Sequence, residues 1–214
     1  MIVSDPPASF YFDLSSPEAY LAAERILHVL PGPAEWQPVL ATRLPRAEAN
    51  GALVGPEHED GEAFRAAIGE RAHALGLQPL RWPDPFPFDS TLAMRVATYA
   101  KSIGRAVPFA QAAFRQAFAG GRSLEQSDHV LIAAAACEMH PAAVLRGSEL
   151  RSVEGELSAA TARAARAGII DVPAVRIGVR VFHGERGLED AAAHMSASFG
   201  SASSLSASSP AVSR

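Results

Sequence analysis

Cysteine is almost absent from this sequence: Cys137 is the one cysteine in 214 residues. A single thiol cannot form an internal disulfide, and it excludes the two-thiol redox motif that a disulfide oxidoreductase needs. Cys137 lies in the run VLIAAAACEMH, which predicts a buried helix. A thiol in such surroundings usually behaves as a small hydrophobic group. We therefore expect Cys137 to pack in the core rather than to act as a nucleophile.

Long hydrophobic runs, basic clusters and metal-binding spacings are also missing. The longest apolar runs, such as residues 130–137, are too short to cross a membrane, and the first ten residues lack the regions of a signal peptide. The net charge of -4 without a run of lysines argues against nucleic acid or an anionic membrane as a partner. The seven histidines show no metal-ligand spacing with cysteines or carboxylates. We expect a soluble cytoplasmic protein without a bound metal.

The first segment with a clear structural pattern is SFYFDLSSPEAYL, residues 9–21. Residues 10–14 alternate like a buried strand, and residues 18–30 carry apolar groups at helical spacing. Between them, Ser16 is a favoured N-cap residue and Pro17 suits the first position of a helix. The start of such a helix has unpaired N–H groups and a partial positive charge, so it can hold an anion such as a thiolate. The alternative is that Ser16 only caps the helix.

A second patterned segment, GIIDVPAVRIGVRVFHGER, lies far downstream at residues 168–186. It predicts a β-hairpin with a short strand at residues 174–177, a tight turn, and a partner strand at residues 179–182. Val172-Pro173 precedes the first strand, where a proline also has a structural reason to lie because it cannot donate to the ladder. Each segment alone has a structural explanation, but the two segments together are a much more specific sign of a functional site than either one.

FYFDLSSPEAYLA, GIIDVPAV and FHGERGL together resemble the 2-hydroxychromene-2-carboxylate isomerases and the kappa-class glutathione transferases. Both are branches of the thioredoxin superfamily that are related to the disulfide-forming DsbA proteins. The proline-rich stretch RWPDPFPFDSTLAMR, residues 81–95, resembles the same family's approach to a helix. The likeness therefore runs from about Phe10 to about Leu188.

The resemblance implies an α/β fold: a thioredoxin-like core of βαβ and ββα halves that is interrupted by a large all-helical insertion. We expect residues 8–61 to form the first half, a βαβ unit followed by a loop. Residues 62–167 show helical apolar patterns separated by glycine and proline, and they predict the insertion. Residues 168–196 would form the second half, with a short last helix at residues 188–195. The serine- and alanine-rich residues 197–214 are expected to be disordered.

The resemblance also implies glutathione as the cofactor. In the family the serine of this turn, here Ser16, faces the sulfur of glutathione, and Pro17 follows it at the helix start. Val172-Pro173 resembles the family's cis-proline corner, where the backbone of the residue before proline pairs with the peptide part of glutathione. The helix dipole and a hydrogen bond from Ser16 would lower the pKa of the glutathione thiol and keep it as a thiolate at neutral pH.

Several positions depart from the family pattern. The asparagine that usually begins the helix after the proline-rich stretch is Asp89 here, which could cap the helix but brings a negative charge toward an anionic ligand. Glu185 and Arg186 replace the usual pair that receives the γ-glutamyl end of glutathione, and Glu185 could supply the carboxylate that its ammonium group needs. Asn50 is the nearest match to the asparagine of the long loop, and Asp171 stands where the family usually has glycine.

Aromatic residues of the proline-rich stretch are candidates for the wall of a substrate pocket, since such pockets are mostly apolar with a few polar groups. The candidates are Trp82, Phe86 and Phe88, together with the neighbouring Asp89. The alternative is that the three aromatic side chains belong to the core, as large apolar residues more often do.

The activity that the resemblance implies is a glutathione-dependent isomerase of a 2-hydroxychromene-2-carboxylate-like aromatic substrate. The reaction would consist of reversible thiolate addition, bond rotation and elimination. A kappa-class-like glutathione transferase shares every site residue and is an alternative. A non-catalytic thioredoxin-fold binding module is another, motivated by the changes at Asp89, Glu185 and Arg186. The substrate would be a small aromatic carboxylate, and the family suggests a homodimer.

Overall fold

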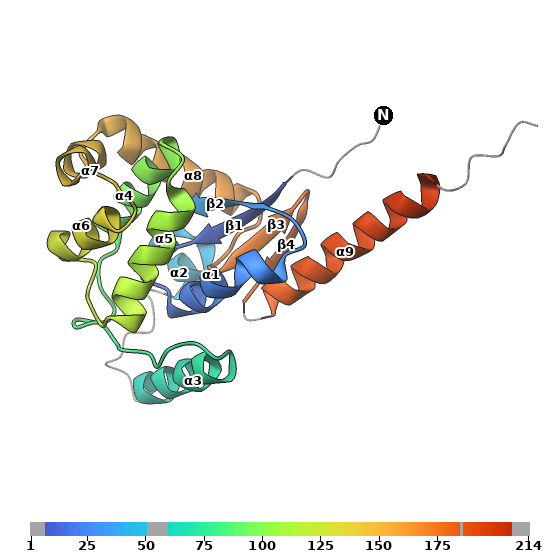
Figure 1. Cartoon of the computed structure of the whole chain (residues 1–214), viewed down its shortest axis with the longest axis horizontal. Coiled ribbons are helices and arrows are strands. Elements are labelled where there is room, and N and C mark those ends of the chain that lie inside the picture. The colour runs from blue at the N-terminus through green and yellow to red at the C-terminus, as the bar shows by residue number, and fades with distance from the viewer. Residues whose placement is uncertain (1–6, 51–59, 185, 207–214) are drawn as a thin grey trace, which may run out of the picture.

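The computed structural model describes residues 7–50, 60–184 and 186–206. Its centre is a four-stranded mixed sheet in the order β2-β1-β3-β4 (Figure 1). The strands are β1 (Ala8–Phe12), β2 (Ala34–Pro38), β3 (Ala174–Ile177) and β4 (Arg180–His183). β1 and β2 are parallel, whereas β3 is antiparallel to both β1 and β4. This is the thioredoxin-like arrangement, and it confirms the predicted fold class.

Helices cover the sheet and fill the described sequence between β2 and β3 (Figure 1). They are α1 (Pro17–Val29), α2 (Pro45–Asn50), α3 (Asp60–Ala74), α4 (Thr91–Ser102), α5 (Ala106–Phe114), α6 (Ser127–Ala135), α7 (Pro141–Ser148), α8 (Arg151–Arg166) and α9 (Gly187–Ser206). A 3-10 turn at Ala41–Arg43 precedes α2, and a π-helical turn at Arg115–Ala119 extends α5. α4 packs against α5, α7 and α8, and α6 packs against α5 and α7, so these five helices form one packed group between the two halves of the core.

The two faces of the sheet carry different residues because side chains alternate along a strand. One face presents Phe10, Phe12 and Trp36, whose ring centroids lie 5.0 Å (Phe10–Trp36) and 5.7 Å (Phe12–Trp36) apart. These rings join α1, α4, α5 and α9 in the main hydrophobic core. On the other face, Tyr11 packs with Ala164 of α8 in a smaller apolar cluster. The sheet is therefore enclosed between two helical layers.

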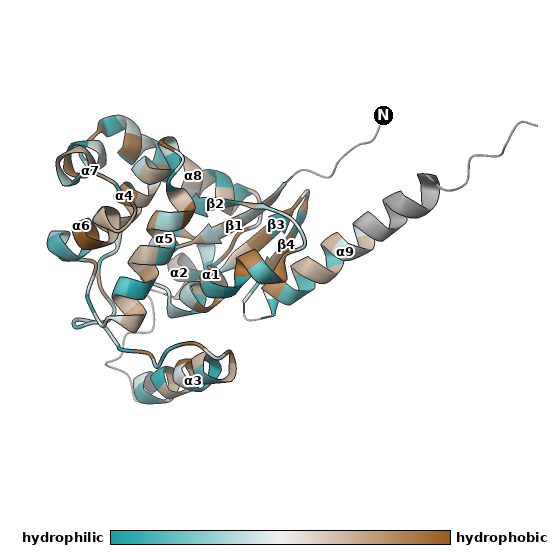
Figure 2. Ribbon diagram, in the orientation of Figure 1, coloured by the Kyte–Doolittle hydropathy of each residue, from teal (hydrophilic) through white to brown (hydrophobic). Residues whose placement is uncertain are grey.

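α3 lies apart from the other helices of the insertion (Figure 1) and contacts α1. Its buried apolar side chains include Ile68 and Ala72, one turn apart. Figure 2 shows hydrophilic and hydrophobic residues interleaved along the rest of α3. The helix therefore covers α1 through a narrow apolar stripe.

β1 ends earlier than the sequence pattern predicted, at Phe12 rather than at Leu14. The reason is a local turn in which the carboxylate of Asp13 accepts a hydrogen bond from the N–H of Ser15 at 3.0 Å. α1 then begins at Pro17, as predicted. The strand–turn–helix unit is confirmed, with the strand shifted toward the N-terminus.

α9 is longer than the sequence indicated. It was expected to end near Met195 and to be followed by disorder, but the structure continues the helix to Ser206. Its first half packs on the core through Leu188, Ala191 and Met195, which are buried. Once a helix is nucleated, each added residue gains one backbone hydrogen bond, and proline is absent from this stretch until Pro210. Residues 207–214 lie outside the described part of the chain.

Candidate functional site

The turn between β1 and α1 is built around Ser16. Its backbone is extended (φ -89°, ψ 115°), and its Oγ accepts a hydrogen bond from the N–H of Ala19 at 3.1 Å. Pro17 occupies the first turn of α1 and Glu18 places a carboxylate there. The predicted N-cap is confirmed. Because the cap uses the oxygen only as an acceptor, the hydroxyl hydrogen of Ser16 can be donated to a ligand.

The loop before β3 is the second element of the site. The peptide bond between Val172 and Pro173 is cis, as the resemblance implied. The carbonyl oxygen of Pro173 accepts a hydrogen bond from the N–H of Gly184 at 3.3 Å. The N–H of Val172 donates to the carboxylate of Asp171 at 2.7 Å. Asp171 therefore occupies a backbone donor that the resemblance assigns to glutathione.

His183 and Arg46 hold this loop in place. The N–H of Ile170 donates to Nε2 of His183 at 3.2 Å, and the carbonyl oxygen of Ile170 accepts from the N–H of Arg46 at 3.0 Å. Arg46 also forms an ion pair with Asp171 at 3.4 Å. Burial lowers the pKa of His183, with Asp171 opposing this effect and Arg46 adding to it. A lowered pKa keeps the imidazole neutral, as an acceptor nitrogen requires.

A cavity of about 330 Å³ is bordered by the first turns of α1 and by the loop before β3. It is formed by α1, α3, the start of α9 and the loop that carries Pro173. The residues that line it are Glu18, Leu21, Ala22, Arg25, Arg71, Ala74, Leu75, Pro173, Gly184, Arg186, Leu188 and Glu189. Its volume is at the small end of the range of about 300–1,000 Å³ that is usual for ligand pockets. The cis-proline thus borders the same space as the first turns of α1.

Charged side chains of both signs gather around this cavity. Arg25 of α1 forms an ion pair with Glu189 of α9. Arg71 and Arg186 add two further cations, and Glu18 adds a carboxylate. Oε2 of Glu189 is buried and has no hydrogen-bond partner among the described residues, although buried polar atoms are normally paired. The surroundings therefore suit a ligand that carries both ammonium and carboxylate groups.

The predicted cofactor-binding residues are only partly assembled at this cavity. Pro173 and Arg186 line it, and Ser16 forms the turn that leads into its α1 wall. Asn50 is the last residue of α2, and its side chain is outside the described part of the structure. Glu185 lies outside the described residues altogether. Sequence reasoning did not select Glu189, since its position at the cavity depends on how α9 docks.

The aromatic residues of the proline-rich stretch form a separate cluster. The ring centroid of Trp82 lies 4.8 Å from that of Phe86 and 6.2 Å from that of Phe118, and the guanidinium of Arg65 lies 5.4 Å from the Trp82 centroid. Phe88 is only 5% exposed and belongs to the main core. In the described part of the chain, none of the three candidate rings lines the 330 Å³ cavity. The structure favours the core alternative for Phe88.

Asp89 directly precedes Ser90, which is the N-cap residue of α4. Oδ1 of Asp89 accepts hydrogen bonds from the N–H of Thr91 at 2.8 Å and from the Thr91 hydroxyl at 2.5 Å. The carboxylate therefore bonds the first residue of α4, but Asp89 is not the N-cap that the sequence allowed it to be, because Ser90 occupies that position. In the described structure Asp89 does not line the cavity beside Pro173.

Asp13, which sequence reasoning missed, is a buried carboxylate beneath the Ser16 turn. It is 0% exposed and accepts hydrogen bonds from the Ser15 N–H and hydroxyl at 3.0 Å each and from the Ala41 N–H at 2.8 Å. Burial raises the pKa of Asp13, while hydrogen bonds from Ser15, Ala41 and the side chain of Ser90 oppose the shift. Asp13 therefore joins the turn to the segment after β2 and to the residue before α4.

Cys137 is buried, and its thiol donates a hydrogen bond to the carbonyl oxygen of Ala133 at 3.4 Å. Burial raises the pKa of the thiol, with Arg105 acting in the opposite direction. The predicted burial of this cysteine is confirmed. Among the described residues, no group of three or more histidine, cysteine or acidic side chains could hold a metal ion. None of the described helices is long and apolar enough to cross a membrane.

A βαβ…ββα core with a serine-capped first helix and a cis-proline loop at one cavity defines a thioredoxin-superfamily protein without a dithiol. The chain belongs to the family of the DSBA-like thioredoxin domain, whose sequence model matches residues 9–196. No curated protein matches the sequence.

Solved structures share this fold at low sequence identity. The structure of a 2-hydroxychromene-2-carboxylate isomerase has a TM-score of 0.82 at 16% identity and covers 94% of this chain and 99% of its own. A probable DsbA oxidoreductase from Streptomyces coelicolor has a TM-score of 0.71 at 20% identity, covering 91% and 90%. The cytosolic disulfide reductase DsbM from Pseudomonas aeruginosa, solved with GSH, has a TM-score of 0.59 at 13% identity, covering 91% and 99%.

Proposed function

We propose that this protein is a glutathione-dependent isomerase of a small aromatic carboxylate that resembles 2-hydroxychromene-2-carboxylate. The observation that carries the proposal is Ser16 at the N-cap of α1, the helix whose first turns line a cavity together with Pro173. A DsbA-type oxidoreductase needs reactive thiols, whereas the single Cys137 is buried elsewhere in the helical insertion. A thiol-based reaction at this site therefore requires a thiol from a cofactor. The likeness to a solved isomerase over nearly the whole chain supports this reaction class.

The residues around the cavity fit glutathione, which carries one ammonium group, two carboxylates and a thiol. Arg71 and Arg186 are cations suited to its carboxylates. The buried, unpartnered Oε2 of Glu189 is suited to its ammonium group. Glu185 was the candidate for that role from the sequence, and Glu189 supplies a carboxylate within the described part of the chain.

At the reacting end, the chain contributes a hydrogen-bond donor and the positive end of a helix. Ser16 donates its hydroxyl hydrogen to the sulfur while its oxygen keeps the bond from Ala19. The α1 dipole adds partial positive charge at the same place. Both effects lower the thiol pKa from its ordinary value of about 8.5. When bound, glutathione supplies the thiolate that adds reversibly to the conjugated substrate and is released unchanged after bond rotation.

The experiment that tests the proposal is an isomerisation assay with purified protein and 2-hydroxychromene-2-carboxylate, followed by absorbance. We expect conversion to the ring-opened isomer only in the presence of glutathione, with the glutathione concentration unchanged at the end. Stoichiometric consumption of glutathione by a general aromatic electrophile, without isomerisation, would instead identify a transferase. If glutathione does not bind at all, the binding-module alternative holds.

Asp171 is expected to weaken glutathione binding, because its carboxylate occupies the N–H of Val172 and adds negative charge beside an anionic ligand. Asp171→Ala should therefore lower the Kd for glutathione by about threefold to tenfold, the worth of one hydrogen bond. Isothermal titration calorimetry measures this change. Arg46→Ala is the matched control, since it breaks the same 3.4 Å ion pair but leaves the N–H of Val172 occupied. Unchanged or weaker binding by the Asp171 variant would contradict this role.

A further inference from the structure

A second cavity, of about 350 Å³, lies on the opposite face of the sheet from α1. Ser9 of β1 is the register partner of both Glu35 of β2 and Arg176 of β3. Residues paired in register point to the same face, and this is the face away from Phe10 and Trp36. All three polar residues line the cavity. The sheet thus provides a polar floor beneath α8.

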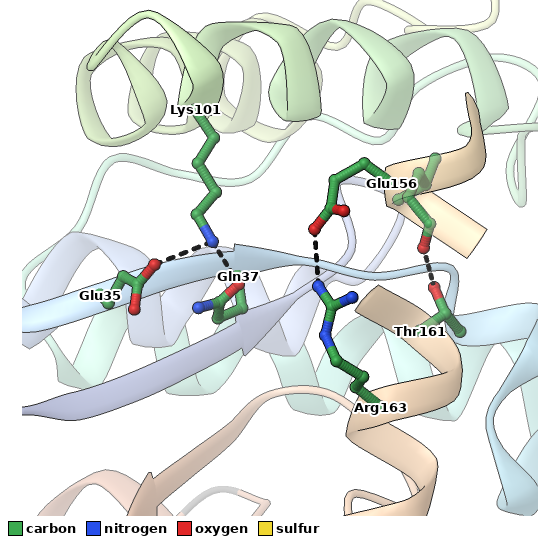
Figure 3. A network of polar contacts seen from close by, with 7 residues as sticks. Glu35, Gln37, Lys101, Glu156, Thr161 and Arg163 are labelled. Carbon is green, nitrogen blue, oxygen red and sulfur yellow. Dashed lines mark hydrogen bonds and ion pairs between the residues drawn. The ribbon is translucent and has the colours of Figure 1, made fainter. Parts of the chain in front are cut away.

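The space above this floor exists because α8 faces the strands with small residues. Ala160 and Ala164 of α8 line the cavity, and neither reaches far toward the strands. Lys101, in the last turn of α4, also lines the cavity, and Figure 3 shows its side chain pointing from α4 toward β2. Alanine side chains on α8 therefore leave a gap that polar side chains from α4, α8 and β3 border.

Cationic side chains dominate this gap: Lys101, Arg163 and Arg176 line it, against the single carboxylate of Glu35 among the described lining residues. Nζ of Lys101 lies 2.9 Å from Oε1 of Glu35 and donates to Oε1 of Gln37 at 2.5 Å. Figure 3 shows Lys101 reaching from α4 to both of these β2 residues. The cation of α4 is therefore already paired.

Arg163 is paired as well, whereas Nε of Arg176 lacks a partner among the described residues. Nη2 of Arg163 lies 2.6 Å from Oε1 of Glu156, and a dashed line marks this ion pair in Figure 3. Nε of Arg176 is buried and has no hydrogen-bond partner in the described structure. A guanidinium stays protonated in proteins, and a buried N–H without an acceptor is costly. The floor of the cavity therefore contains a permanent positive charge with an unmet donor.

We propose that this cavity binds a small oxyanion, a carboxylate or a phosphate, through Arg176, with Lys101 and Arg163 at its rim. An oxyanion supplies the acceptor that Nε lacks, and the planar guanidinium is suited to two-point recognition of such a group. The cavity shares no lining residue with the cavity at Pro173. The two sites are therefore separate, and this one does not depend on the proposed activity.

Calorimetric titration with inorganic phosphate and with succinate, each at constant ionic strength set by sodium chloride, tests the proposal. We expect saturable binding of one of the two probes, which also decides between phosphate and carboxylate. Arg176→Gln should weaken that binding by about tenfold or more, the worth of a charged hydrogen bond. Arg180→Gln is the matched control, because Arg180 is an exposed arginine on the adjacent strand β4 and should bind as the wild type does.

Two further measurements keep the test decisive. Arg163→Gln changes an exposed side chain, so it should fold normally and weaken binding by a smaller factor even if Arg176→Gln proves unstable. Glutathione binding should be unchanged in both variants. The proposal is overturned if neither probe binds the wild type saturably, or if both variants bind the probe as tightly as the wild type.

Discussion

Ser16→Ala is expected to lower kcat/KM for glutathione-dependent turnover by about a hundredfold or more. The expected size is that of removing one hydrogen-bond donor from an anion at the reacting centre. Ser16 also caps α1 through the 3.1 Å bond from Ala19, so the variant should lose about 1 kcal/mol of unfolding free energy. Steady-state kinetics and chemical denaturation measure the two effects separately.

Two companion variants separate the cap from the thiol contact. Ser16→Thr keeps both the capping oxygen and the hydroxyl donor, and it should retain most of the activity. Ser16→Asp keeps an N-cap acceptor but replaces the donor by a negative charge, so it should be stable and inactive. The loss of activity in Ser16→Ala should also become smaller at alkaline pH, where the glutathione thiol ionises without a hydrogen bond from Ser16. Full activity of Ser16→Ala or of Ser16→Asp at neutral pH would contradict the role of Ser16.

Asp13→Ala is expected to lower the free energy of unfolding by about 2–5 kcal/mol. The buried N–H groups of Ser15 and Ala41 would lose their acceptor, at about 1–3 kcal/mol each. The hydroxyls of Ser15 and Ser90 would also lose this acceptor. Part of the lost stability is offset because the variant no longer buries a carboxylate. Denaturant unfolding followed by circular dichroism measures the change. Stability within about 0.5 kcal/mol of the wild type would contradict the role of Asp13 as an anchor.

The pH dependence of stability gives an independent test of Asp13. Its folded-state pKa is raised by burial, whereas in the unfolded chain it is about 3.9. As the pH rises above the unfolded value, the unfolded state releases this proton first, so the folded state loses stability until the pH passes the folded pKa. Asp13→Asn removes this contribution. The stability of the wild type relative to Asp13→Asn should therefore decrease as the pH rises from about 3.9, and a constant difference would contradict the raised pKa.

Local signals in the sequence were sufficient where the interacting groups are close in the chain. The cap at Ser16 depends on Pro17 and Ala19, which are its near neighbours, and the structure has it as predicted. The first strand of the hairpin, Ala174–Ile177, also matches its prediction. Glycine and proline mark the ends of such elements because they restrict or permit particular backbone angles.

Contacts between distant segments could not be predicted in this way. Asp13 bonds to Ala41, 28 positions along the chain, and it also receives a bond from Ser90, so its sequence neighbourhood indicated only a turn. The rings of Trp82 and Phe86 were candidates for a pocket wall although core packing was the more frequent alternative, since apolar surface is buried in both cases. In the structure both rings pack against Phe118 of the helical insertion, a contact between segments more than 30 positions apart.

The ionisation of glutathione on the protein tests the central claim most directly. Ultraviolet absorbance of the thiolate is followed against pH with glutathione and a slight excess of protein, in a Cys137→Ala background that removes the chain's own thiol. We predict a thiol pKa at least about one unit below its ordinary value of about 8.5, and a return toward that value on Ser16→Ala. An unshifted thiol pKa in the wild type, or no saturable binding of glutathione, would contradict a thiolate site at the start of α1.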